Sequence, residues 1–156
     1  MKKNIIIFVV VAIILGVGIF FITNKKVSIT GTEFKNIMKE KNYVVNDAKN
    51  QFESYDYIKK VYIAASSDYS YQIEFYEMSD SNKAMSFYNT NKNIFESDKG
   101  SLSSNYSVNI SNYSKYSLSS DSSYKVISRI DNTVIYVNSK KENKDKIKKV
   151  LKKLGY

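Results

Sequence analysis

The chain has 156 residues, contains no cysteine, histidine, proline or tryptophan, and carries a formal net charge of +9. Without cysteine and histidine, it has no disulfide, no Ser-His-Asp or Cys-His nucleophile, and no ordinary zinc or copper site. The charge lies at the ends, with +4 in residues 1–26 and +6 in residues 140–153, whereas residues 27–139 carry −1. No basic stripe interleaved with aromatics crosses the chain, so no nucleic-acid partner is expected. Its five glycines form no phosphate-binding loop, and no cofactor is expected.

The segment Ile5–Ile22 is a run of eighteen apolar residues with lysines on both sides. As a helix it would be about 27 Å long, close to the roughly 30 Å hydrocarbon core of a bilayer. A cleaved signal peptide is the alternative, but this run is longer than the usual apolar region, and no A-x-A-like cleavage site follows it. We therefore predict a retained membrane anchor. The expected division is a cytoplasmic tail (1–4), an anchor (5–23), a linker (24–29) and one α+β domain (30–156).

The side of the membrane on which the domain lies is suggested by the residues that flank the anchor. Lysines are more numerous after the anchor than before it, so the positive-inside count taken literally places the domain in the cytoplasm. However, Lys2 and Lys3 lead straight into the apolar run, as in an export signal, and large domains translocate largely regardless of charge. We expect the N-terminus inside and the domain outside the cell membrane.

The first half of the domain is predicted to form two helices and three strands. Thr30-Gly31-Thr32-Glu33 matches a capping box, and apolar residues then recur at helical spacing. Ser79-Asp80-Ser81 likewise offers capping residues for a second helix. Residues 46–56 are ambiguous and allow one or two helical turns. The predicted elements are a helix at 32–41, a strand at 43–45, a hairpin of strands at 58–66 and 69–76, and a helix at 80–96.

The second half begins with a serine-rich tract, residues 97–124, whose composition is compatible with disorder. Alternating apolar residues nevertheless predict a loop at 97–104 followed by one or two exposed strands. Asp131-Asn132 predicts the turn of a hairpin with strands at 124–130 and 133–137. A Lys-rich amphipathic helix at 140–154 ends before Gly155. Together these elements predict an antiparallel sheet covered by about three helices.

Catalytic groups are few in this composition. Paired carboxylates such as Glu74 and Glu77 would suit glycoside hydrolysis, but alternation places them on opposite faces of a strand or across its end. Serine and lysine are so abundant that no single Ser–Lys dyad stands out. The spacing of Asp80, Asp98 and Asp121 is not that of a calcium-binding loop. We expect no metal site and no enzymatic activity.

Two features are candidate binding elements. Arg129 is the only arginine, and its planar guanidinium suits a carboxylate or phosphate, although an ion pair with Asp131 is the simpler explanation. Exposed strand tyrosines would offer a contact surface for protein or glycan, although tyrosine also fills strands for its β propensity. The tyrosines selected on this basis are Tyr71, Tyr76, Tyr113 and Tyr116. The Lys-rich last helix would suit anionic lipid or wall polymer, or would simply be solvated.

The basic start, apolar run and Lys/Tyr/Ser-rich domain ending in KDKIKKVLKKLGY resemble small single-pass extracytoplasmic proteins of low-GC Gram-positive bacteria. The resemblance covers the whole chain, rests on no specific motif, and assigns no functional residue. It implies a membrane-anchored, non-catalytic module that binds an envelope protein or an anionic polymer or lipid. The alternatives are an envelope enzyme that acts on glycan through carboxylates and a membrane adaptor that faces the cytosol.

Overall fold

The computed structural model of the chain describes residues 25–156, and the predicted anchor lies outside the described residues. One sheet of seven strands, all pairs of which are antiparallel, forms the centre of the domain in the order β1-β2-β3-β7-β6-β5-β4. The strands are β1 (Val44–Asp47), β2 (Ile58–Ala65), β3 (Gln72–Met78), β4 (Ser104–Ile110), β5 (Tyr113–Ser119), β6 (Ser123–Ile130) and β7 (Thr133–Lys140).

Hairpins between consecutive strands make up most of the sheet, and one pairing between distant strands joins its two parts. Short turns join β2 to β3 and β4 through β7 in succession, so neighbours in sequence are neighbours in space. The exception is the pairing of β3 with β7, in which Phe75 lies opposite Ile135. This pairing joins the two halves of the chain, because β3 ends the first half and β7 is the last strand.

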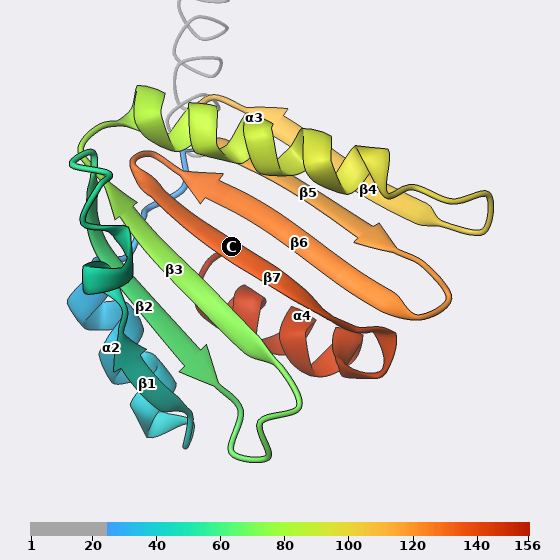
Figure 1. Cartoon of the computed structure of the whole chain (residues 1–156), viewed down its shortest axis with the longest axis horizontal. Helices are drawn as coiled ribbons and strands as arrows, with labels where there is room; N and C mark the ends of the chain where they lie inside the picture. Colours follow the sequence, from blue (N-terminus) through green and yellow to red (C-terminus); the bar gives the residue numbers. More distant parts are fainter. Residues whose placement is uncertain (1–24) are drawn as a thin grey trace, which may run out of the picture.

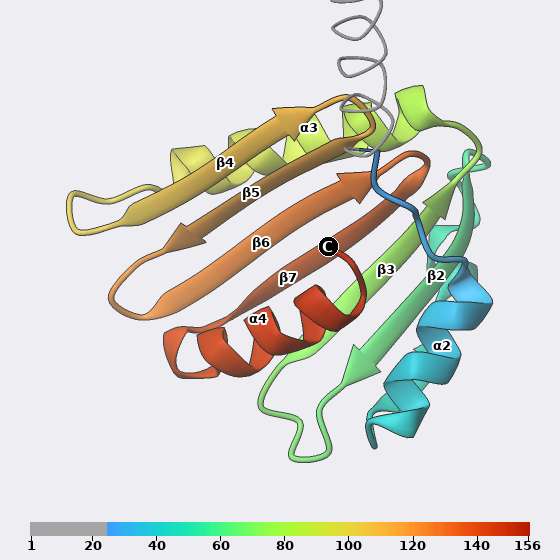
Figure 2. The same cartoon turned by 180° about the vertical axis from the view of Figure 1, so that it is seen from behind.

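The helices cover both faces of the sheet (Figures 1 and 2). They are α2 (Gly31–Glu40), α3 (Ser81–Ser97) and α4 (Lys144–Lys153), with short 3₁₀ turns η1 (Lys49–Phe52) and η2 (Lys141–Asn143). Helices α2 and α4 lie on one face, which we call the α4 face. Helix α3 and the η1 turn lie on the opposite face, which we call the α3 face.

Each face therefore has its own apolar core. On the α4 face, Phe34 of α2 stacks on Phe75 of β3 with ring centroids 4.9 Å apart, and Ile147 and Leu151 of α4 are fully or almost fully buried. On the α3 face, Ala84, Tyr88 and Phe95 of α3 pack over the central strands. Alternate residues of β3 and β7 contribute to opposite cores, as the period of two requires.

The structure confirms the α+β class and an antiparallel sheet covered by three helices. Both predicted N-terminal caps are present, since Thr30 and Glu33 form the capping box of α2 and Asp80 caps α3. The turn residue Asp131 and the helix-terminating Gly155 adopt positive φ, at 49° and 85° respectively. The serine-rich tract forms two strands, of which β4 is exposed and β5 largely buried. Among residues 25–156, no helix has the length and hydropathy needed to span a bilayer.

Lys26, near the start of the described residues, contacts Asn112 and Gly155, which come much later in the chain. The Lys26 backbone exchanges two hydrogen bonds with the side chain of Asn112, at 3.2 Å and 2.6 Å. The Lys26 ammonium donates to the carbonyl of Gly155 at 2.7 Å and lies 4.0 Å from the ring centroid of Tyr113. We call this set of contacts the Lys26 clamp. It fixes the residues before α2 against the turn between β4 and β5 and against the C-terminus.

Candidate functional site

The structure buries the residues that were predicted to bind a partner. Arg129 is 3% exposed, and Tyr71, Tyr76, Tyr113 and Tyr116 are between 1% and 8% exposed. They therefore do not form the exposed tyrosine surface that was expected. The physical reason is that the sheet carries helices on both faces, so a residue on the less apolar face of a strand is buried as well. The four tyrosines also lie on different faces, with Tyr71 and Tyr113 on the α4 face and Tyr76 and Tyr116 on the α3 face.

Arg129 is held by hydrogen bonds inside the fold and does not face an open binding surface. One of its terminal nitrogens donates to the Asp131 carbonyl at 3.0 Å, and the other lies 3.4 Å from the Ser114 hydroxyl. Its contact with Asp131 is thus to the backbone carbonyl, and the Nε atom is buried without a partner in the described structure. Burial lowers the pKa of Arg129, and the nearby Asp131 carboxylate opposes this effect. These contacts fix the hairpin between β6 and β7.

The carboxylates Glu74 and Glu77 lie on opposite faces of β3, as alternation predicted. Glu77 is on the α4 face, where it accepts from Lys60 and from the backbone of Gly31 at the start of α2. Glu74 is on the α3 face, where it accepts from the Tyr76 hydroxyl at 2.6 Å. Because the sheet separates them, these two side chains cannot flank the same glycosidic bond.

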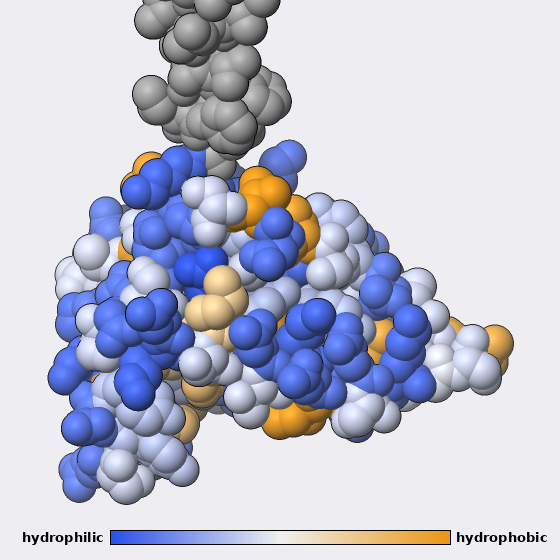
Figure 3. Space-filling model, turned by 90° about the horizontal axis from the view of Figure 1, so that it is seen from above, coloured by the Kyte–Doolittle hydropathy of each residue, from blue (hydrophilic) through white to orange (hydrophobic). Residues whose placement is uncertain are grey.

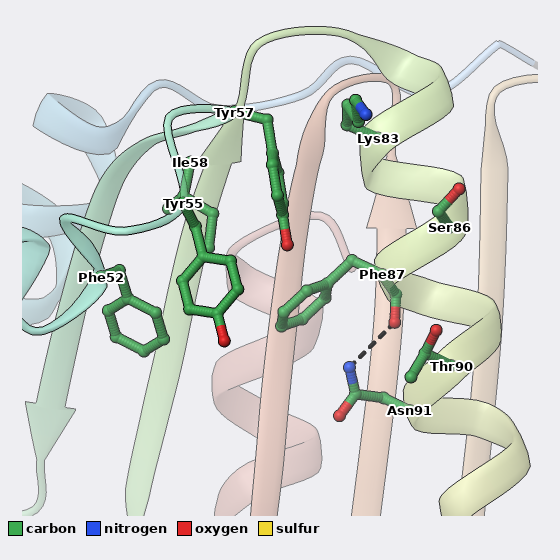
Figure 4. Close-up of a pocket in the computed structure, with 9 residues that line it drawn as sticks. All are labelled: Phe52, Tyr55, Tyr57, Ile58, Lys83, Ser86, Phe87, Thr90 and Asn91. Carbon is green, nitrogen blue, oxygen red and sulfur yellow. Dashed lines mark hydrogen bonds between the residues drawn. The ribbon is translucent and has the colours of Figure 1, made fainter.

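A pocket of about 440 Å³ on the α3 face is the candidate site because it is lined by four aromatic side chains. One wall is the segment that follows η1, and the other is the N-terminal half of α3. Figure 4 shows Phe52, Tyr55 and Tyr57 on one side and Phe87 pointing toward them from α3. We call this pocket the aromatic groove. Its lining residues are Phe52, Tyr55, Tyr57, Ile58, Lys83, Ser86, Phe87, Thr90 and Asn91.

The local backbone explains why the aromatic side chains of the first wall point into the groove. The amides of Tyr55 and Ile58 donate to the carbonyls of Phe52 and Tyr55, each at 3.0 Å, so two tight turns hold this segment. The carbonyl of Tyr57 accepts from Ser79 at 2.8 Å, which attaches the wall to the start of α3. The groove is thus held between two ordered elements.

Tyr76 of β3 lies beneath the groove and joins its walls. Its ring is 5.6 Å from that of Phe52, in an edge-on arrangement, and 4.8 Å from that of Phe87. Burial, and then the neighbouring Glu74 carboxylate, raise the pKa of Tyr76. The hydroxyl therefore stays protonated and donates to Glu74. Of the five predicted binding residues, Tyr76 alone contacts this site, through the lining residues Phe52 and Phe87.

The chemistry of the groove is that of an aromatic contact site with a polar rim. No carboxylate lines it, and its one charged residue, Lys83, lies with its ammonium 5.3 Å from the ring centroid of Tyr57. The amide of Asn91 is already engaged with the Phe87 carbonyl at 2.8 Å. Within residues 25–156, no cluster of three carboxylate, histidine or cysteine side chains is placed to hold a metal. The groove is suited to taking an apolar or aromatic group out of water.

The aromatic residues of the first wall were missed because their segment shows no clean period in the sequence. Phe52, Tyr55 and Tyr57 occur in the segment 46–56 and just beyond it, where the pattern fits neither helix nor strand. The available signal was the combination of several aromatic residues with tight turns, since an irregular segment rarely buries such side chains in a core. On the second wall, Phe87 lies in a predicted helix, but its side chain is only half-buried.

Well-exposed hydrophobic side chains of the described residues lie mostly outside the aromatic groove. Figure 3 shows one side of the molecule as mostly hydrophilic, with hydrophobic residues in small separate patches. Within residues 25–156, the large hydrophobic residues that are well exposed are Val27, Val44, Tyr55, Tyr69, Ile94, Leu102, Tyr106 and Ile110. Only Tyr55 among them lines the aromatic groove.

Comparison with known proteins identifies no relative. No family model matches the chain, and neither a curated protein nor a solved structure matches it significantly. The class defined by the fold and the groove is thus an α+β domain with an aromatic pocket, and its function has to be argued from its own residues.

Proposed function

We propose that the chain is a membrane-tethered, non-catalytic binding module whose domain lies outside the cytoplasm and binds a partner protein. The observation that carries the proposal is the aromatic groove, which is concave, largely apolar and held by ordered elements on both sides. Aromatic residues are enriched at the centres of protein interfaces, where charged residues are depleted. The groove has this composition, with charge only at its rim.

The expected occupant is an apolar or aromatic side chain on an exposed segment of the partner. Full burial of such a side chain contributes about 1.5–3 kcal/mol, which is enough to make one residue the anchor of an interface. Tyr55 is 47% exposed and Phe87 is half-buried, so both retain contact area that a partner would cover. Tyrosine adds contact area at low entropic cost, which suits a surface that binds another protein.

The binding experiment uses the full chain in its native membrane. A photo-reactive amino acid at Thr90, on the groove wall, should crosslink to one partner protein, and the same probe at Tyr69, which is 71% exposed in the turn between β2 and β3, should not. Phe87→Ser should abolish the Thr90 crosslink, whereas Tyr69→Ser should leave it unchanged. Equal crosslinking from both positions, or a crosslink that survives Phe87→Ser, would refute the groove as the binding site.

The side of the membrane is tested separately. A periplasmic-type alkaline phosphatase fused after Tyr156 is active only when it is exported, so the proposal expects activity. An inactive fusion together with an active cytosolic reporter at the same position would instead support the membrane adaptor that faces the cytosol.

The positions of Glu74 and Glu77 restrict which carboxylates a glycan-acting enzyme could use. This carboxylate lies on the α3 face beside Tyr76, whereas Glu77 lies on the other side of the sheet. A catalytic pair would therefore need a partner for Glu74 other than Glu77. Turnover of cell-wall glycan by the full chain that is lost in Glu74→Gln would overturn the non-catalytic proposal.

A further inference from the structure

A second pocket lies on the opposite side of the sheet from the aromatic groove. Figure 2 shows that α2 and α4 leave β5 and β4 without a covering helix on the α4 face. A pocket of about 340 Å³ is formed there by β4, β5 and β6 together with the N-terminal half of α4. We call it the lysine pocket, after Lys115 of β5 and Lys144 and Lys148 of α4, which all line it.

The lysine pocket gathers positive charge without negative charge. No aspartate or glutamate lines it, and none of the ion pairs among the described residues includes Lys115, Lys144 or Lys148. Burial, together with the ammonium groups of Lys26 and Lys148, lowers the pKa of Lys115 to about 8. Half-burying a lysine beside other lysines is unfavourable, and an anion in the pocket would relieve this cost.

Hydroxyl groups complete the lining. Ser117 and Ser119 of β5 and Ser104 of β4 line the pocket, with Tyr106 and Tyr124 beside them. The Lys144 ammonium already donates to the Ser119 hydroxyl at 3.2 Å, which holds this lysine toward the pocket. Three ammonium groups and several hydroxyls are more donors than the two oxygens of one carboxylate can accept. A phosphate group, with its additional oxygens and greater charge, matches them better.

We propose that the lysine pocket binds the phosphate group of a phosphomonoester or phosphodiester, with Lys115, Lys144 and Lys148 as the charged contacts. This site is independent of the aromatic groove, which lies on the other face of the sheet. It also gives the Lys-rich last helix a specific role, because two of its lysines line the pocket while Lys149, Lys152 and Lys153 lie elsewhere along it.

The test is a titration of the full chain, in a maltoside detergent, with inorganic phosphate and with dimethyl phosphate. Amide chemical shifts of β5 and the start of α4 should change saturably, and an equal ionic strength of sodium chloride should not reproduce the change. The paired substitution Lys115→Gln with Lys148→Gln should weaken phosphate binding at least fivefold. The matched control, Lys149→Gln with Lys153→Gln, removes the same amount of charge, from α4 alone, and should leave binding unchanged.

The single substitution Lys148→Gln controls for misfolding of the double variant, because Lys148 is exposed on the surface of α4 and its replacement does not disturb the core. It should weaken phosphate binding while the unfolding midpoint stays the same. Equal weakening by the control pair, or equal shifts with chloride, would show that these lysines are only solvated and would overturn the proposal. Binding of dimethyl phosphate without binding to vesicles that contain phosphatidylglycerol identifies a soluble or polymeric phosphate source, and binding to both identifies a lipid headgroup.

Discussion

The Lys26 clamp gives the sharpest test of how the domain is joined to the segment before it. Asn112 is 9% exposed and is the centre of the clamp. Its side chain accepts from the Lys26 amide, donates to the Lys26 carbonyl, and donates to the Asp131 carboxylate at 3.0 Å. The substitution Asn112→Ala removes all three hydrogen bonds and leaves the sheet ladder of β4 and β5 in place.

The expected cost follows from the kind of hydrogen bond that is lost. A neutral hydrogen bond contributes about 0.5–1.5 kcal/mol net, and one to a charged group about 1.5–3 kcal/mol. The backbone of Lys26 lies near the surface, so water replaces part of the hydrogen bonding that it loses in the variant. We therefore expect Asn112→Ala to lower the free energy of unfolding by about 1–3 kcal/mol, and the N-terminal segment to open more often than the domain unfolds.

The assay combines urea denaturation with limited trypsin digestion of the full chain in detergent. Cleavage after Lys26 should be at least about fivefold faster in Asn112→Ala, since 1 kcal/mol corresponds to roughly that ratio of open to closed states. Asn105→Ala, at an exposed position of β4, is the matched control and should change neither quantity. Unchanged cleavage and a loss of stability below about 0.5 kcal/mol would refute the clamp as a structural constraint.

Two further predictions concern stability. Thr30→Ala removes the cap of α2 and should lower the free energy of unfolding by about 1 kcal/mol in urea, whereas Thr32→Ala in the same turn should leave it within about 0.5 kcal/mol. Lys115 has its pKa lowered from 10.5 to about 8 on folding, so between these pH values the unfolded chain binds more protons at this group and stability rises with pH. Between pH 8 and pH 10 the free energy of unfolding of the natural chain should therefore increase relative to that of Lys115→Gln, as measured by denaturation of both, and an equal change in both would contradict it.

Local features of the fold were predictable because each depends on a few neighbouring residues. The capping box at Thr30, the cap at Asp80 and the positive φ at Asp131 follow from side chains that act within three residues of themselves. The strands of the serine-rich tract were also visible as alternation, although composition argued for disorder. Element type and approximate bounds were therefore accessible from the sequence.

The arrangement of the elements was not accessible in the same way. Pairing of β3 with β7 is a contact between distant segments, and no local residue specifies it. This pairing puts α3 on one face and α2 and α4 on the other, which buries both sides of the central strands. As a result Tyr76, which alternation puts on the less apolar face of its strand with Gln72 and Glu74, is a core residue. The aromatic groove and the lysine pocket exist only because of this arrangement.

The position of the Lys26 clamp indicates which source of phosphate the lysine pocket would meet. The clamp lies at the start of β5, beside Tyr113, whereas Ser119 and Lys144 lie at the other end of that strand. Ser119 is the sixth residue after Tyr113, which is about 20 Å along the strand at roughly 3.3 Å per residue. If the proposed membrane tether precedes Lys26, it would hold the clamp end of β5 nearer the bilayer than the Ser119 end. The Ser119 and Lys144 end of the pocket would then meet a soluble or polymeric phosphate more readily than a lipid headgroup, although Lys115 lies nearer the clamp, within electrostatic range of the Lys26 ammonium. We therefore expect dimethyl phosphate to bind where phosphatidylglycerol vesicles do not, and binding to the vesicles through Lys144 would show that the domain lies flat on the membrane instead.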